Sequence, residues 1–161
     1  MMAGKILDVP KIKQLRGEYC AVASLNMVLS YYGYEIAQKE LANFFHDPEC
    51  IKDEGVFYKD VAFAAGSLGF KAEEYYNFTL ENIINCIDNG TPIIARGKSH
   101  TSPRCRHFRV IKGYETNPSY VYVNDPYYTR RNRFSYDTFR SLWLIKGSNG
   151  TKNYGVVIKP N

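Results

Sequence analysis

The sequence lacks the features that define several large protein classes. Its 161 residues contain four cysteines, and no two of them have the two-residue spacing of a zinc knuckle or a redox motif. No apolar run reaches the ~18 residues that a membrane span needs. The N-terminal segment, Met1 to Gln14, has scattered charges and lacks the apolar core of a signal peptide. We therefore expect reduced thiols, a cytoplasmic location and no membrane domain.

Neither sign of charge is in large excess. The formal net charge is +5, which is small for a dedicated nucleic-acid binder, so nucleic acid is not an expected partner. Much of the basic character comes from six arginines between residues 104 and 133: Arg104, Arg106, Arg109, Arg130, Arg131 and Arg133. We interpret these arginines as residues of solvated loops, the alternative being contact with an acidic or phosphate-bearing partner. A composition of 45% hydrophobic and 23% charged residues is globular, and the length favours a single domain, 1–161.

The first half of the chain predicts helices. The segment from Cys20 to Tyr32 carries no charge, is apolar on nearly every side and ends before Gly33, a pattern typical of a buried helix. Thr79 is a predicted N-cap, with Asn82 at the third helical position. Further helices are expected over residues 36–45, 57–68 and about 79–89.

The second half predicts strands, because its apolar segments are rich in β-branched and aromatic residues. Strands are expected over residues 5–9, 92–97, 106–113, 120–124 and 154–159, with a short helix or turn over 136–143. Since the helices come first and most of the strands second, the expected fold class is α+β. The helical half should pack on an antiparallel sheet.

One cysteine is placed where a thiol becomes reactive. Cys20 begins the buried helix, and the partial positive charge of a helix N-terminus favours thiolate over thiol. Asp125 follows the strand 120–124, and a hairpin with the strand 106–113 brings it beside His107. Gln14 lies six residues before Cys20, in the loop that leads into the helix.

These residues resemble the C39 cysteine peptidases and their stand-alone relatives, which have the papain-like fold. The resemblance rests on Gln-x5-Cys (14–20), His-Phe-x-Val-Ile-x-Gly-Tyr (107–114) and Val-Tyr-Val-Asn-Asp-Pro (121–126), and it extends to about Trp143. It implies a thiol-dependent peptidase that hydrolyses a peptide or isopeptide bond in a peptide or protein substrate, without a cofactor or a metal.

The resemblance also implies a role for four residues. Cys20 is the expected nucleophile, because sulfur attacks a carbonyl as thiolate. His107 is the expected base, with Asp125 accepting a hydrogen bond from its Nδ1–H and orienting the ring. Gln14 is expected to donate its side-chain amide to the oxyanion, beside the backbone N–H of Cys20. Where the family usually has glycine after the nucleophile, this chain has Ala21, which bears on substrate fit more than on chemistry.

Several alternatives remain open at this point. The same triad would serve an acyl transferase or amidase, and a papain-like scaffold would also serve as a non-catalytic binding module. Asn124 competes with Asp125 as the partner of the imidazole, but alternation along the strand puts the two on opposite faces, and Asp125 is favoured. Cys105 would share a face with His107, so a disulfide to Cys20 or a zinc site of Cys20, Cys105, His107 and Asp125 is chemically allowed but less favoured.

Two further segments are candidates for substrate contact. The stretch from Tyr127 to Arg133 directly follows Asp125 and would form an aromatic and basic wall of the cleft, the alternative being a solvated loop. His100 lies in the loop before the strand 106–113 and is more simply a solvated residue. The sequence does not indicate an oligomeric state.

Overall fold

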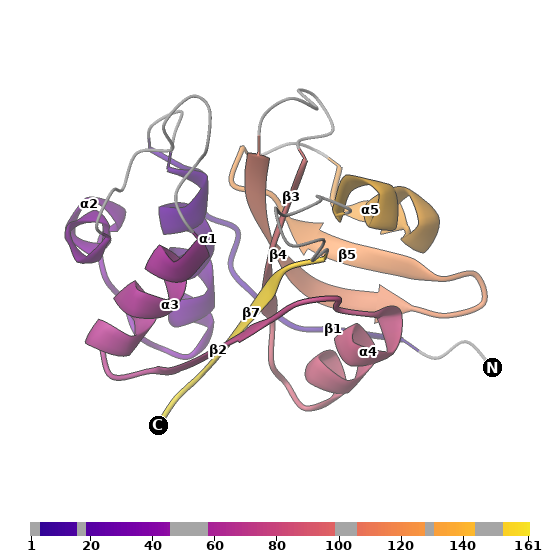
Figure 1. Ribbon diagram of the computed structural model, residues 1–161, viewed down its shortest axis with the longest axis horizontal. Helices are drawn as coiled ribbons and strands as arrows, with labels where there is room; N and C mark the ends of the chain where they lie inside the picture. The colour runs from indigo at the N-terminus through magenta and orange to yellow at the C-terminus, as the bar shows by residue number, and fades with distance from the viewer. Residues whose placement is uncertain (1–3, 16–18, 46–57, 99–105, 128–130, 144–152) are drawn as a thin grey trace.

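The fold is one antiparallel sheet with a group of helices on one side and further helices apart from that group, as the computed structural model in Figure 1 shows. The structure describes residues 4–15, 19–45, 58–98, 106–127, 131–143 and 153–161. The strands are β1 (Gly4–Ile6), β2 (Lys71–Tyr75), β3 (Ile93–Lys98), β4 (Arg106–Glu115), β5 (Tyr120–Asn124), β6 (Arg133–Ser135) and β7 (Gly155–Lys159). The helices are α1 (Cys20–Tyr31), α2 (Gln38–Leu41), α3 (Tyr58–Ser67), α4 (Leu80–Asp88) and α5 (Tyr136–Trp143), with a 3-10 turn η1 (Ala42–Phe44).

Helix α1 is the buried helix that its uncharged sequence predicts. Its residues from Cys20 to Leu29 are all buried. Helices α2 and α3 pack on α1, which in turn packs against β4 (Figure 1). Gly33 follows the helix with φ of +84°, a left-handed conformation that glycine adopts without strain. Helix α1 thus ends before Gly33 and packs against β4, an inner strand of the sheet.

The sheet has the strand order β2-β7-β3-β4-β5-β6, with β1 also paired to β4. In the β4–β5 hairpin Val110 lies opposite Asn124, with a register shift between Ile111 and Gly113. On the other side of β4, His107 lies opposite Gly97 of β3. The hairpin that the sequence predicts is confirmed, and it brings the end of β5 back toward the start of β4.

Helix α4 begins with the predicted cap. Thr79 Oγ1 accepts from the Asn82 backbone N–H at 3.1 Å, and Asn82 Oδ1 accepts from the Thr79 backbone N–H at 2.9 Å. The two side chains thus form a reciprocal capping box, in which asparagine replaces the usual glutamate or glutamine.

Four elements differ from the sequence prediction. The strand expected over 5–9 is only β1, Gly4–Ile6. The helix expected over 36–45 is only α2 followed by η1, and its N-cap residue, Ala37, has no side-chain group that accepts a hydrogen bond. Strands β2 and β6 were not predicted. Strand β2 has the charged sequence Lys-Ala-Glu-Glu-Tyr and pairs along one edge with β7, so it has little of the apolar alternation of an inner strand. Among the described residues, no helix is long and apolar enough to cross a membrane.

Candidate active site

Cys20 is the first residue of α1 and carries a buried thiol. The N-cap residue, Tyr19, makes no side-chain cap bond within the described part of the chain. Its carbonyl accepts the first helical hydrogen bond, from the Ala23 N–H at 2.8 Å. With Cys-Ala-Val-Ala in its first turn, the helix has no acidic side chain to offset the positive end of its dipole. This environment favours negative charge on the sulfur.

His107, near the start of β4, and Asp125, directly after β5, form a buried pair. His107 Nε2 lies 2.7 Å from Asp125 Oδ1, and both side chains are almost fully excluded from solvent. The sequence predicted this partnership but assigned it to the wrong ring nitrogen, since the contact uses Nε2 and not Nδ1. The opposite nitrogen, Nδ1, is also buried.

Tyr127 contacts both members of the His107–Asp125 pair. Its ring stacks on the His107 imidazole with a centroid distance of 4.3 Å and an interplanar angle of 4°. Its backbone N–H donates to Asp125 Oδ1 at 2.9 Å. Of the wall proposed for 127–133, Tyr127 therefore lies at this site. Arg131 and Arg133 instead stack over the rings of Phe134 and Tyr120.

Asn124 does not compete for the imidazole. Its side-chain Nδ2 donates to the carbonyl of Val9 at 2.8 Å, deep in the structure. Strand alternation puts Asn124 and Asp125 on opposite faces of the sheet, as the sequence predicts. The carboxylate, rather than the amide, is the group that contacts His107.

Gln14 is held beside the turn that follows β5. Its backbone N–H donates to the Pro126 carbonyl at 2.9 Å, and its side chain is largely buried. Gln38 of α2 brackets the same loop: its Oε1 accepts from the Leu15 N–H at 2.8 Å and its Nε2 donates to the Lys13 carbonyl at 3.1 Å. The sequence analysis missed Gln38, because no local pattern marks a glutamine that holds a distant loop.

The sequence analysis also misread Arg109, which it placed in a solvated loop. Its side chain is buried on the His107 face of β4. Nη2 donates to the Lys98 carbonyl at 2.9 Å, and Nε lies 3.7 Å from Asp125 Oδ2. Asp125 therefore lies between an imidazole and a guanidinium.

The neighbours of Asp125 control the charge of its carboxyl. Burial alone would raise the pKa of Asp125, but the hydrogen bond and charge of His107, the Tyr127 N–H and the charge of Arg109 together hold it below its ordinary value. Burial lowers the pKa of Arg109, whereas the negative charges of Asp125 and Cys20 oppose that change. A guanidinium keeps its proton despite such a shift, so the site has two ionised side chains of opposite sign.

The remaining sequence candidates fall outside the described residues. They are His100, Cys105, Arg104 and Arg130, together with the side chain of Arg106. Among the described residues, no group of three His, Cys, Asp or Glu side chains is arranged to hold a metal ion.

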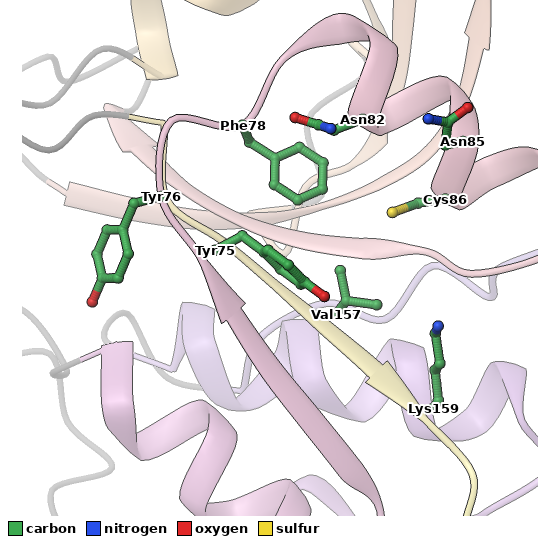
Figure 2. A pocket seen from close by; sticks show the side chains of 8 residues that line it. All are labelled: Tyr75, Tyr76, Phe78, Asn82, Asn85, Cys86, Val157 and Lys159. Carbon is green, nitrogen blue, oxygen red and sulfur yellow. The ribbon is translucent and has the colours of Figure 1, made fainter.

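A separate pocket of about 220 Å³ lies between α4, β2 and β7. Figure 2 shows its lining side chains: Tyr75, Tyr76, Phe78, Asn82, Asn85, Cys86, Val157 and Lys159. Burial raises the pKa of the Cys86 thiol, which makes this cysteine a poor nucleophile. None of the four predicted site residues lines this pocket.

Comparison with known proteins agrees with the fold. Residues 6–150 match the family described as Peptidase_C39 like, and the chain belongs to this family. A search of curated proteins gave no match.

Several solved structures have a similar fold. A putative C39-like peptidase from Bacillus anthracis superposes with a TM-score of 0.74 at 20% identity, covering 99% of this chain and 98% of the other. The peptidase domain of Streptococcus ComA, a bifunctional ABC transporter of a quorum-sensing pathway, gives 0.70 at 19% identity, covering 94% and 98%. A double-glycine-motif protease from an AMS/PCAT transporter, solved with its leader peptide, gives 0.66 at 22% identity, covering 98% and 95%. The α+β, papain-like fold is confirmed, and family and fold together support a cysteine peptidase function.

Proposed function

We propose that this chain is a single C39-type domain that hydrolyses a peptide or isopeptide bond through Cys20, His107 and Asp125, with Gln14 as an oxyanion donor. The observation that supports it best is the buried contact of 2.7 Å between His107 and Asp125, made on the strand against which the Cys20 helix packs. A polar pair exposed to solvent would cost the fold less free energy than a buried pair does. A buried pair on a strand that packs against a helix beginning with cysteine is suited to activating a thiol.

Each atom has a task in the proposed reaction. His107 Nδ1 takes the proton of the Cys20 thiol, while Nε2–H stays bonded to the Asp125 carboxylate. The thiolate attacks the carbonyl carbon, and the resulting oxyanion accepts hydrogen bonds from the Gln14 side-chain amide and the Cys20 backbone N–H. The imidazolium then protonates the leaving amine, which leaves a thioester on Cys20. Water, deprotonated by His107, hydrolyses the thioester and releases the acid and the thiol.

The proposed substrate is a peptide or a protein. A solved relative of the same fold is a double-glycine-motif protease bound to a leader peptide, so peptides that end a leader in two glycines are the first to try. Ala21 follows the nucleophile and is fully buried. Its methyl group therefore packs in the core.

A cleavage assay tests the proposal. The purified chain is incubated with double-glycine leader peptides and with a broad mixture of unrelated peptides, and the products are identified by mass spectrometry. We expect cleavage at defined bonds that stops when Cys20 is replaced, Cys20→Ala, with the fold retained in circular dichroism. Products that form only when an amine is added would instead indicate acyl transfer. A chain that is inert toward every peptide, or a Cys20→Ala variant that is equally active, contradicts the proposal.

A further inference from the structure

We propose that Arg109 is a positioning residue of the active site, whose buried charge orients the Asp125 carboxylate and favours the thiolate of Cys20. The inference rests on the proposed function, because it assigns Arg109 to the same thiol. It adds a second cation to a site in which the proposed mechanism uses only one, the imidazolium of His107.

The sheet is shaped to hold this side chain. Continuing the register of β4 and β5 places Asp125 directly opposite Arg109, on the face that also carries His107. On the other side of β4, Arg109 lies opposite Ala95, and the next position on that face of β3 is Gly97. A Cβ at Gly97 would lie 3.3 Å from Arg109 Nη1 and 2.7 Å from the Leu142 carbonyl oxygen. Small residues on β3 thus leave the space that the guanidinium occupies.

The contacts of Arg109 are too few to offset the free-energy cost of burying its charge, if its role is purely structural. The side chain is 1% exposed, and its contacts to acceptors are one hydrogen bond to the Lys98 carbonyl and an ion pair of 3.7 Å with Asp125 among the described residues. The Nε group makes no hydrogen bond within the part of the chain that the structure describes. A buried ion pair of this quality seldom stabilises a fold more than apolar packing would. A role in the chemistry of the site accounts for the charge.

The charges around Arg109 set the direction of its effect. Asp125 and Cys20 are the groups whose negative charge acts on it, and His107 lies on the other side of Asp125 with Tyr127 stacked over its ring. A fixed positive charge favours the ionised forms of the thiol and the carboxyl, and it disfavours the protonated imidazole. Removing that charge should therefore move the titrations of Cys20 and His107 in the same direction, toward alkaline pH.

The test measures where Cys20 titrates when the charge is changed. Alkylation by iodoacetamide is followed between pH 4 and pH 10, with the modified cysteine mapped by mass spectrometry. The midpoint of the rate against pH is compared for the wild-type chain, Arg109→Gln, Arg109→Met and Arg109→Lys. The matched control is Arg140→Gln, which makes the same change in net charge at an exposed position of α5. Circular dichroism and thermal unfolding check that each variant folds.

We expect Arg109→Gln and Arg109→Met to raise the Cys20 midpoint by about one pH unit, the effect of losing one nearby opposite charge. The Cys20 midpoint of Arg109→Lys should stay closer to the wild-type value. The midpoint of Arg140→Gln should equal the wild-type value, because an exposed charge is screened. An NMR titration of His107 should move upward in the same two neutral variants.

The outcomes separate this inference from the proposed function. A wild-type Cys20 that titrates like an ordinary thiol, near pH 8.5, would contradict both. A low wild-type midpoint that is unchanged in folded Arg109→Gln and Arg109→Met would overturn the role of Arg109 alone. Failure of both neutral variants to fold would also overturn it, since the charge would then be a requirement of the structure.

Discussion

Replacing Asp125 by asparagine is a nearly isosteric change that removes one charge from the buried cluster. The carboxylate lies 3.7 Å from Arg109 Nε, and an ion pair at that distance is worth about 4 kcal/mol at an effective dielectric constant of 20. The variant no longer buries a carboxylate but leaves Arg109 buried without a counter-charge. Breaking one side of a buried pair typically costs about 3–5 kcal/mol. For a chain of this size that corresponds to a fall in Tm of about 10 °C.

The pH dependence of the same variant is diagnostic. Because the folded protein holds the pKa of Asp125 below its ordinary value, the carboxylate stabilises the fold above pH 4, roughly the unfolded value. That stabilisation is lost as the pH falls through the lower, folded pKa. The difference in unfolding free energy between wild type and Asp125→Asn should therefore be largest at neutral pH and narrow below about pH 4. Urea unfolding followed by circular dichroism, repeated between pH 7 and pH 3, measures it.

Asp8→Asn provides the control, because it makes the same chemical change at an exposed position and should cost less than about 0.5 kcal/mol. In peptide cleavage Asp125→Asn should keep a small residual activity, since the amide oxygen still accepts from His107 Nε2–H without balancing the imidazolium charge. A difference in stability that is constant from pH 7 to pH 3 would refute the reasoning, because it would mean that the native carboxyl is not held ionised.

Three other substitutions have separate outcomes. Gln14→Ala should lower kcat of peptide cleavage by about 10²–10³ with little change in KM, as for one lost oxyanion donor; a change confined to KM would point to substrate binding instead. Gly97→Ala places its Cβ 2.7 Å from the Leu142 carbonyl oxygen, so thermal unfolding should show a clear fall in Tm. An unchanged Tm would mean that α5 moves away from β3 without loss of stability. Asn124→Ala loses the bond to the Val9 carbonyl and should cost about 1–3 kcal/mol in urea unfolding while kcat stays near wild type; the reverse pattern would make Asn124 the partner of the imidazole.

Much of the site could be predicted because its positions follow from local patterns. The uncharged run after Cys20 is typical of a buried helix, and the helix begins where the charge pattern changes. The hairpin brings Asp125 toward His107, and strand alternation separates it from Asn124. These conclusions need only the periods of helices and strands.

The parts that the sequence did not predict depend on contacts between distant segments. Arginine is seldom fully buried, so Arg109 resembles a surface residue until the small residues of β3 and the carboxylate of Asp125 are placed beside it. Gln38 holds the Gln14 loop across more than twenty residues of sequence, and nothing near it signals that role. Strand β2 exists because β7 pairs with it, although its own residues are mostly charged.

The activation of Cys20 is the central claim, and a comparison of two thiols in one molecule tests it most directly. Cys86 is an internal reference, because burial raises the pKa of its thiol. The measured quantity is the pH midpoint of iodoacetamide alkylation at each cysteine, since absolute rates also depend on access and Cys20 is only 2% exposed. We predict a Cys20 midpoint well below the ordinary thiol value of about 8.5, a Cys86 midpoint above it, and an upward move of the Cys20 midpoint alone in His107→Ala. Equal midpoints for the two cysteines, or a Cys20 midpoint that His107→Ala leaves unchanged, would contradict the assignment of Cys20 and His107 as nucleophile and base.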